Sequence, residues 1–357
     1  MHPKQQNSPN LFSVQGFTVA PKRATIKDVA ERAGVSYQTV SRVANGKGEV
    51  LPATRRRVEK AMQALHYRPS MIARSMVAGR AFTLCCISPN LTDYTFASLI
   101  EGAEAEARQQ GYLLLSASAA HESDVKRLCE EVVESGRVDG VLAINPYADA
   151  RHRAFEALHA EGIPVVYLGA RPRQIKIPSV HLDDAGAGYQ ATQHLIALGH
   201  RRIATLLGPT NEDCVGDRLD GYRRALREAE ISFSKKLVAQ GDWSATAGYE
   251  CTRALLNAQI AFTALFAQND RMAIGAIRAL RERGLGVPND VSVIGFDDMP
   301  LTSYFDPPLT TMHQDTFGIG RAAAQLMLQT LNDIANTPAQ ISISAKLVQR
   351  ASTGAVP

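Results

Sequence analysis

The feature that most constrains the fold is a long alternation of short apolar runs and longer amphipathic stretches, which begins near residue 81 of this 357-residue chain. The apolar runs predict strands, and the stretches between them repeat their apolar residues at helical spacing. Predicted strands cover residues 83–87, 112–116, 140–143, 164–168, 202–207, 237–240, 264–267 and 291–295. Predicted helices cover residues 97–109, 122–136, 150–161, 185–198, 215–229, 246–256, 270–283 and 317–332. This order predicts two similar α/β lobes with parallel sheets and a ligand cleft between them.

Residues 25–45 predict two short amphipathic helices joined by a turn. Thr25 and Asp28 fit a capping box at the start of the first helix. Gly34 permits the sharp turn, and Ser36 can cap the second helix. The pattern is a helix-turn-helix signature, although a helical hairpin with a purely structural role shows the same pattern.

A third predicted helix runs from Pro52 to Leu65 and carries three consecutive arginines, Arg55 to Arg57, near its start. Residues 21–80 hold 13 Lys and Arg against 4 Asp and Glu, whereas the whole chain has a net charge of +4. The positive charge is therefore concentrated in this N-terminal module, and the body is acidic. Such a distribution indicates a polyanion that binds the module alone, and the three arginines are either phosphate contacts or an ordinary solvated surface.

Composition and motifs argue against several other classes of protein. The five cysteines form no CxxC pair and show no spacing typical of zinc ligands or of a disulfide framework, so we expect small buried apolar side chains. The first 20 residues lack the apolar core of a signal peptide, and no stretch could span a bilayer, so we expect a cytoplasmic protein with no membrane partner. Residues 318–323 fit GxGxxA but lack the preceding dinucleotide-binding unit, and no nucleophile motif occurs. We therefore expect no catalytic residue, no metal and no cofactor.

The run from Gly34 to Val43, followed by Asn45, resembles the lactose repressor family of bacterial transcriptional regulators. Further matching runs lie at residues 54–55, 58–59, 61–62, 67–69, 197–200, 241–245, 269–273, 295–298, 307–315 and 349–350. The resemblance thus covers nearly the whole chain. It implies an all-α helix-turn-helix headpiece and an α/β body similar to a periplasmic sugar-binding protein, with two parallel-sheet lobes.

The resemblance also implies how the chain is divided. We expect a disordered leader at residues 1–23, a DNA-binding headpiece at 24–69, a hinge helix or linker at 70–80, a ligand-binding and dimerisation body at 81–350 and a tail at 351–357. Within the body, we expect lobe 1 to comprise about residues 81–182 and 316–343, and lobe 2 about residues 183–312 and 344–350.

For the headpiece, the resemblance implies that the second helix enters the major groove of DNA. The residues that would reach base edges are Tyr37, Gln38 and Arg42. Their chemistry suits this role, because an arginine can donate two hydrogen bonds to guanine and a glutamine can pair with adenine through two. The residues that would hold the DNA backbone are Lys27, Ser36, Thr39, Ser41, Asn45 and Thr54.

Two positions of the headpiece and hinge depart from the family pattern. The family inserts a leucine of each hinge helix into the minor groove, and here Met76 holds that position, with Ala73 as the second hinge residue at the groove. A methionine can also act as a wedge, so a kink in the DNA is a hypothesis for this chain. At the start of the third helix, Leu51 replaces the usual capping serine.

For the body, the resemblance implies a sugar site formed by Arg218, Trp243, Asn269, Asp297 and Gln314. Sugar hydroxyls donate and accept hydrogen bonds, so guanidinium, amide and carboxylate groups suit them, and an indole can lie against a pyranose. Three further candidates follow the first predicted strand: Asp93, Tyr94 and Phe96. Gly169 stands where the member that names the family has an aspartate, which leaves the identity of the sugar open.

These inferences predict a dimeric repressor that binds a pseudo-palindromic operator and is released allosterically by a sugar-type effector. Two alternatives stay open at this point. A transport-type sugar-binding protein would explain the body but not the basic headpiece, and a corepressor-dependent regulator would bind a nucleobase. No heptad-patterned helix follows residue 350, so we expect a dimer and not a tetramer.

Overall fold

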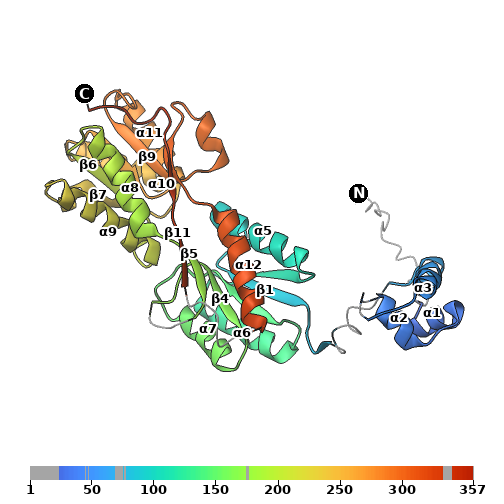
Figure 1. The fold of residues 1–357 in the computed structure, drawn as a ribbon. Coiled ribbons are helices and arrows are strands. Elements are labelled where there is room, and N and C mark those ends of the chain that lie inside the picture. The colour runs from blue at the N-terminus through green and yellow to red at the C-terminus, as the bar shows by residue number, and fades with distance from the viewer. Residues whose placement is uncertain are drawn as a thin grey trace, which may run out of the picture. The chain divides into compact units, whose positions relative to one another are not determined.

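The computed structural model describes residues 24–44, 46, 48–68, 75, 78–173, 177–332 and 340–356. The expected leader and three expected DNA-contacting residues, Asn45, Ala73 and Met76, lie outside these ranges. The chain divides into two compact units, Met1–Gly79 and Arg80–Pro357, which we call the headpiece and the body. Figure 1 labels the helices and strands of both units.

The headpiece consists of α1 (Ile26–Ala33), α2 (Tyr37–Ala44) and α3 (Pro52–Ala64). Thr25 and Asp28 form the expected capping box of α1, and Gly34 ends this helix with a left-handed backbone at φ 61°. Each helix contributes one completely buried valine to the core, namely Val29, Val40 and Val58. The core therefore fixes which face of each helix points outward.

Lobe 1 of the body is built on a parallel sheet with the strand order β11-β5-β4-β3-β1-β2. Its strands are β1 (Thr83–Ser88), β2 (Leu113–Ser118), β3 (Gly140–Ala143), β4 (Val165–Gly169), β5 (Ser179–Leu182) and β11 (Gln340–Ile343). Its helices are α5 (Tyr94–Gln109), α6 (Glu122–Ser135), α7 (Arg151–Ala160) and α12 (Thr316–Asn332). Leu84 and Cys86 of β1 pack with α5 and α12, whereas Cys85 and Ile87 pack with α6 and α7. Helices therefore cover both faces of the sheet (Figure 1).

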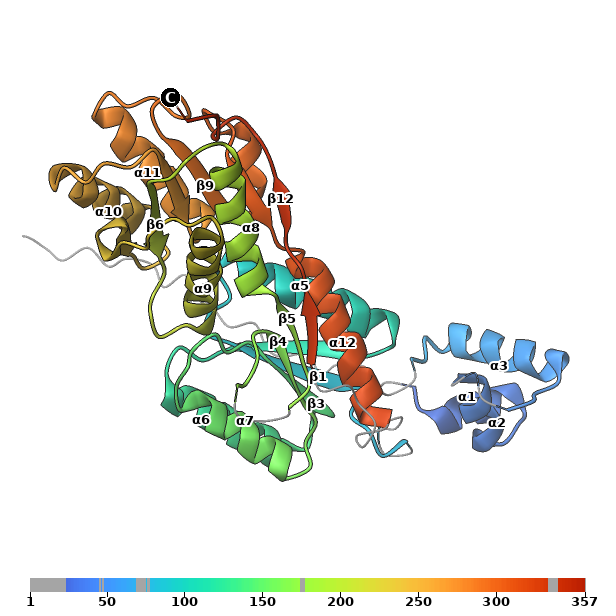
Figure 2. The same ribbon diagram turned by 60° about the vertical axis from the view of Figure 1, so that its left-hand side comes forward.

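Lobe 2 repeats this plan with the strand order β12-β10-β9-β8-β6-β7, in which only β12 is antiparallel to its neighbour in the described sheet. Its strands are β6 (Ile203–Leu207), β7 (Val238–Gln240), β8 (Ala264–Ala267), β9 (Ser292–Asp297), β10 (Thr310–His313) and β12 (Lys346–Val348). Its helices are α8 (Asp184–Ala197), α9 (Asp213–Glu228), α10 (Ala245–Asn257) and α11 (Asp270–Glu282), with short 3-10 helices η1 (Lys235–Leu237) and η2 (Pro300–Tyr304). Figure 2 shows α8 and α9 beside the strands of this lobe.

The fold class expected from the sequence is confirmed, since a three-helix headpiece precedes two sheet-based lobes. Four strands lie outside the predicted series of apolar runs: β5, β10, β11 and β12. Each has three or four residues, and each contains polar side chains that interrupt its apolar run. They are strands because neighbouring strands supply their hydrogen bonds, which a short sequence window does not reveal.

The segment after residue 350 differs from the expected tail, because residues 351–356 are part of lobe 2. Ser352 is completely buried. Its hydroxyl donates to Val293 O at 2.6 Å and accepts from the Thr310 N–H at 2.8 Å. The polar composition of the segment resembles a solvated end, but lobe 2 satisfies its hydrogen bonds.

Three pairs of neighbouring helices pack through glycines that face the partner's backbone. The pairs are Gly102 of α5 with Gly320 of α12, Gly188 of α8 with Gly221 of α9, and Gly248 of α10 with Gly275 of α11. A Cβ at Gly275 would lie 1.9 Å from Ala245 O, and one at Gly320 would lie 2.1 Å from Leu99 O. Glycine is therefore required at these contacts, which fix the paired helices closely together.

The first residue of the body is anchored to the end of α12. Arg80 Nη2 donates to Leu331 O at 3.0 Å, and Arg80 Nη1 donates to Asn332 Oδ1 at 3.2 Å. A guanidinium is favourable here, because the last carbonyls of a helix carry partial negative charge. α12 starts at Thr316, so this helix extends from Thr316 to the contact with Arg80 at the start of the body.

Candidate DNA-binding surface and ligand cavity

The outward face of α2 carries the three side chains expected to read bases. Tyr37 is 56 % exposed, and Gln38 and Arg42 are also exposed. Val40 and Val43, on the opposite face, are buried in the headpiece core. The three side chains therefore project from one side of a helix whose orientation the core fixes, as base readout in a major groove requires.

The side chains expected to hold the DNA backbone differ in their surroundings. Lys27 is exposed, whereas Ser41 and Thr54 are half-buried. Ser36 Oγ accepts from the Thr39 N–H at 3.2 Å and lies 3.0 Å from Thr39 Oγ1. Ser36 and Thr39 thus form the N-terminal cap of α2, which stabilises the first turn of this helix.

Arg57 stabilises the turn between the first two helices, because its Nη2 donates to Gly34 O at 3.3 Å. Leu51 occupies the cap position of α3 and its side chain makes no capping hydrogen bond, and Pro52 begins the helix. Proline is favourable at this first position because its missing N–H would have no helical partner. The basic run of α3 therefore includes a residue with a structural role, which its sequence does not distinguish from its neighbours.

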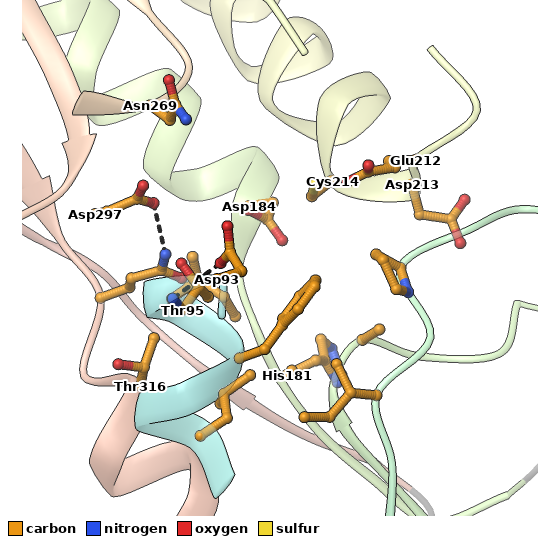
Figure 3. A pocket seen from close by; sticks show the side chains of 18 of the residues that line it. Asp93, Thr95, His181, Asp184, Glu212, Asp213, Cys214, Asn269, Asp297 and Thr316 are labelled. Carbon is orange, nitrogen blue, oxygen red and sulfur yellow. Dashed lines mark hydrogen bonds between the residues drawn. The ribbon is translucent and has the colours of Figure 1, made fainter. Parts of the chain in front are cut away.

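A cavity of about 200 Å³ lies in the body and is lined by residues of both lobes. Asp93 and Thr95 come from the start of α5, and Thr316 comes from the start of α12 (Figure 3). On the lobe 2 side, Asn269 precedes α11 and Asp297 ends β9. The cavity therefore lies where strands end and helices begin, which is where α/β folds of this kind bind ligands. Its volume suits a compact ligand.

Seven of the eight side chains expected to bind the ligand line this cavity: Asp93, Phe96, Arg218, Trp243, Asn269, Asp297 and Gln314. Tyr94 does not line it and is 38 % exposed at the first position of α5. Burial raises the pKa of the Tyr94 hydroxyl, and the Asp298 and Asp297 carboxyls raise it further, so Tyr94 is within electrostatic reach of the cavity residue Asp297. A ligand contact by Tyr94 stays a prediction.

Arg218 is held by an ion pair and by ring stacking. Its Nε donates to Asp184 Oδ1 at 2.8 Å, and its Nη1 donates to Gln268 O at 2.6 Å. Its Cζ lies 3.6 Å from the centre of the Phe296 ring. Arg218 is only 6 % exposed, so its guanidinium has a fixed position in the cavity wall.

Trp243, the only tryptophan in the sequence, forms another part of the wall. Its backbone has φ 72°, and its carbonyl accepts from Asn269 Nδ2 at 3.0 Å. Its indole hydrogen-bonds with the Glu212 carboxyl. A Cβ at Gly208 would lie 2.2 Å from the indole Cζ2, so the missing side chain of this glycine makes room for the ring.

Asp297 has φ 113°, which is uncommon for an aspartate. Its Oδ1 accepts from Gln314 Nε2 at 2.7 Å, the bond drawn to the labelled Asp297 in Figure 3. Burial and the neighbouring Asp270 carboxyl raise the pKa of Asp297 well above its ordinary value. A buried carboxyl on a strained backbone is typical of functional sites, since the surrounding structure must stabilise it.

Two parts of the chain match known families. Residues 25–70 match bacterial regulatory proteins of the lacI family, and residues 192–353 match the periplasmic binding protein-like domain. The HTH-type transcriptional repressor CytR of Escherichia coli strain K12 is 34 % identical over 94 % of this chain and 97 % of its own length. This chain belongs to the lacI family. The HTH-type transcriptional regulator CelR of Thermobifida fusca is also 34 % identical, over 93 % of this chain and 98 % of its own length.

Solved structures of this family have a similar fold. The lac repressor dimer bound to operator and the anti-inducer ONPF gives a TM-score of 0.84 at 33 % identity, over 94 % of this chain and 100 % of that chain. The complex of the regulator CelR with cellobiose gives 0.71 at 33 % identity, over 92 % and 100 %. This lacI-family protein is therefore a DNA-binding transcriptional repressor and not an enzyme.

Sequence reasoning misses several charged residues that line the cavity of this lacI-family repressor. They are Arg171, Asp184, Glu212, Asp213, Asp217 and Arg271. Glu212 precedes α9 and Asp213 is its first residue, so both follow β6 as Asp93 follows β1, and the rule that finds Asp93 would also find them. Arg171 follows β4 in the same way, whereas Asp184 follows β5, a strand that the apolar pattern does not predict.

The cysteines behave as apolar side chains where they are buried. Cys85, Cys86 and Cys129 are buried, and burial raises the pKa of Cys85 to about 11, which keeps the thiol protonated. Within the described part of the chain, no three His, Cys, Asp or Glu side chains are placed to hold a metal ion. The helices of the described residues also include none that is long and apolar enough to cross a membrane.

Proposed function

We propose that this lacI-family repressor binds a pseudo-palindromic operator as a homodimer and that a sugar-type ligand in the body cavity releases it. The cavity itself carries the proposal, because it joins Arg218, Trp243 and Asn269 of lobe 2 with Asp93 and Phe96 of lobe 1. A ligand that contacts both lobes binds one arrangement of the lobes more tightly than another. It therefore shifts the population toward that arrangement, and operator affinity changes with it.

Base recognition belongs to the exposed face of α2. Arg42 donates two hydrogen bonds to a guanine, Gln38 pairs with an adenine, and Tyr37 contacts a neighbouring base edge. Phosphate contacts come from Lys27, Ser36, Thr39, Ser41, Asn45 and Thr54, and minor-groove contacts come from Ala73 and Met76. The exposure of Tyr37, Gln38 and Arg42 supports this assignment.

The ligand assignment rests on the type of side chain in the cavity. Arg218 and Asn269 offer planar groups that can pair with neighbouring hydroxyls, and Asp297 offers an acceptor. Trp243 offers a flat apolar surface for one face of a sugar ring. The solved CelR complex contains cellobiose, and a lacI-family regulator from Enterococcus faecium was solved with bound ribose, which supports a ligand of this class.

A second copy of the chain would cover apolar side chains that are exposed in the single body. Leu113 and Leu115 are 59 % and 52 % exposed on β2, which lies at the edge of its sheet. Leu301 and Tyr304 are also exposed on lobe 2. Such patches favour association between chains, and the solved lac repressor is a dimer.

Selection of bound DNA from a random pool, with and without added sugars, tests the proposal. We expect a two-fold symmetric site that is recovered less efficiently when a cavity ligand is present. An asymmetric site would contradict the homodimer on its operator, and an operator affinity that no cavity ligand changes would contradict the release mechanism. Stronger operator binding with a nucleobase would instead show a corepressor.

A further inference from the structure

The cavity wall contains more acidic than basic groups. Six carboxyl groups line it, from Asp93, Asp184, Glu212, Asp213, Asp217 and Asp297. Three guanidinium groups line it, from Arg171, Arg218 and Arg271. A ligand in this cavity is therefore surrounded by an excess of acidic groups.

Two of the three guanidinium groups are already paired with carboxylates. Arg218 Nε lies 2.8 Å from Asp184 Oδ1, and both side chains are almost completely buried. Arg271 Nη2 lies 2.7 Å from Asp93 Oδ2. An anionic ligand would have to compete with these carboxylates for the same two guanidinium groups, and separating a buried ion pair costs free energy.

Asp213 and Asp217 share one cation from outside the lining. Arg173 Nε lies 2.7 Å from Asp213 Oδ1, and Arg173 Nη2 lies 2.8 Å from Asp217 Oδ1. One positive charge thus faces two negative charges. Among the described residues, Arg171 is the lining guanidinium for which the ion pairs show no carboxylate partner, and one such group does not balance the acidic excess.

The two remaining carboxyl groups receive hydrogen bonds from neutral donors. Glu212 accepts from the Trp243 indole, and Asp297 accepts from the Gln314 amide. Burial raises the pKa of Glu212, and burial together with Asp270 raises that of Asp297, so additional negative charge nearby is unfavourable. Carboxylate oxygens need donors, which hydroxyl and ammonium groups supply and phosphate oxygens do not.

We propose that this cavity selects a polyhydroxyl ligand that is uncharged or carries an amine, and that it rejects the phosphate ester of the same compound. The proposal rests on the proposed function and narrows its ligand class. A phosphate group adds close to two negative charges at neutral pH, and it would enter a cavity whose cations are mostly paired.

Calorimetric titration of the full-length repressor with matched compounds tests the proposal. The probes are glucose with glucosamine and glucose 6-phosphate, ribose with ribose 5-phosphate, cellobiose with its phosphate, and adenosine and cytidine with their monophosphates. We expect at least one unphosphorylated compound to bind, and its phosphate to bind at least about 100-fold more weakly. Where the amino sugar binds as tightly as its parent, the cavity accepts a cation. Where only the parent binds, it requires an uncharged ligand.

A charge-neutral variant checks that the carboxyl groups cause the discrimination. Glu212→Gln should reduce the affinity ratio between the parent compound and its phosphate by about fivefold or more. Glu228→Gln is the matched control, because it removes the same charge from the other end of α9, where Glu228 bonds with Arg224 and Tyr189. An unchanged ratio in Glu212→Gln would show that the acidic wall does not decide specificity.

Tighter binding of any phosphorylated compound than of its parent would overturn the proposal. The absence of any unphosphorylated ligand in the panel would overturn it as well. Failure of the proposed function is distinguishable, because it would appear in the DNA selection as a missing symmetric operator or as operator binding that no bound ligand changes.

Discussion

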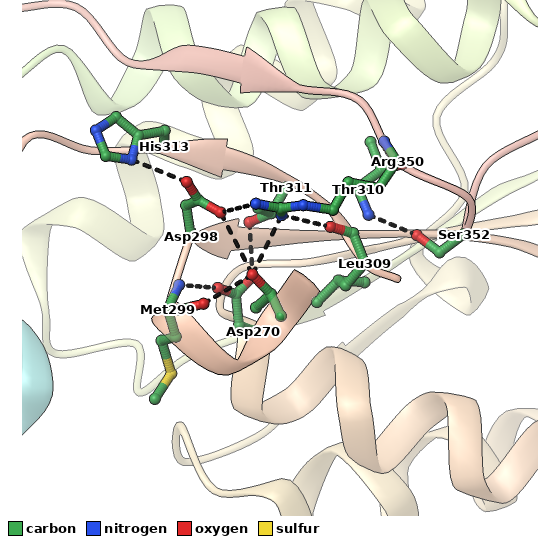
Figure 4. A network of polar contacts seen from close by, with 10 residues as sticks. Asp270, Asp298, Met299, Leu309, Thr310, Thr311, His313, Arg350 and Ser352 are labelled. Carbon is green, nitrogen blue, oxygen red and sulfur yellow. Dashed lines mark hydrogen bonds and ion pairs between the residues drawn. The ribbon is translucent and has the colours of Figure 1, made fainter. Parts of the chain in front are cut away.

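Asp270 is completely buried at the first position of α11, next to Asn269 in the cavity wall. Its Oδ1 accepts from Thr311 Oγ1 at 2.6 Å, and its Oδ2 accepts from the Met299 N–H at 2.8 Å. Figure 4 shows this carboxyl beside Asp298, which lies 2.6 Å from Arg350 Nη2. At the scale of single residues, the cavity wall is thus supported by two further carboxyls that do not line it, the buried Asp270 and the half-buried Asp298.

The charge of Asp270 predicts a pH dependence of stability. Burial raises its pKa to about 7, whereas the unfolded chain has the ordinary value of about 4. Between these values the folded protein holds a proton that the unfolded chain releases, so the free energy of unfolding falls as pH rises from about 4 to 7. The melting temperature should therefore fall more between pH 5 and pH 8 in the natural protein than in Asp270→Asn. Asp306→Asn is the control, because the Asp306 side chain is 92 % exposed, and equal pH slopes in all three proteins would contradict the assignment.

We predict that Arg42 determines which DNA sequence is bound and does not only increase the affinity for DNA of any sequence. We expect Arg42→Ala to weaken operator binding by about 1–3 kcal/mol and to relax the preference at one base position. Fluorescence anisotropy at one fixed salt concentration measures the effect on operator and on random DNA. Arg32→Ala, which removes an exposed arginine from the last turn of α1, is the charge control. Equal losses on both DNAs in Arg42→Ala would assign Arg42 to a phosphate.

At the scale of elements, the sequence predicts the helices and the longer strands because their apolar residues repeat over enough residues to be recognised. It does not predict β5, β10, β11 and β12, whose few residues form strands only because neighbouring strands of the sheet bind them. The site shows the same division. The family resemblance locates Arg218 and Trp243 in the cavity. It does not reveal that carboxyl groups such as Asp217 line the same cavity, because these groups come from segments that are distant in the sequence.

The glycine contacts between paired helices predict an unusual sensitivity to a single methyl group. Gly275→Ala places a Cβ 1.9 Å from Ala245 O, so we expect a loss of about 1–3 kcal/mol in the free energy of unfolding. Gly216→Ala is the matched control, since nothing lies within 4 Å of its Cβ, and alanine should stabilise α9 by about 0.5–1 kcal/mol. Denaturant unfolding followed by the fluorescence of Trp243 reports on the body. Equal stability of the two variants would show that the α10–α11 contact can relax.

At the scale of the whole molecule, α12 connects two places that matter for regulation. Thr316, at its first residue, lines the cavity, and Leu331 and Asn332, at its last residues, bind Arg80. Arg80 directly follows the headpiece unit in the chain. A helix of this length is rigid enough to transmit a displacement, since the glycine pair formed by Gly102 and Gly320 holds it against α5.

Arg80→Gln should weaken the connection between cavity and headpiece without removing either function. We expect operator affinity without ligand to change by no more than about threefold, and the change in operator affinity caused by a cavity ligand to shrink by about 1 kcal/mol or more. Operator titrations with and without ligand measure both quantities. Arg108→Gln is the control, because Arg108 pairs with Glu104 within α5. A full ligand response in Arg80→Gln would exclude this route.

The backbone around the cavity also determines where a biosensor based on this protein can be redesigned. Gly169 has φ 76°, and a Cβ there would lie 2.8 Å from Leu99 Cδ1, so the aspartate of the family's namesake would not fit without strain. Trp243 and Asp297 likewise have left-handed backbones. Phe96 and Thr316 face the same cavity from ordinary helical positions, where no left-handed backbone restricts the residue type. Mutant libraries designed to bind a new analyte should vary these two positions and keep Gly169, Trp243 and Asp297.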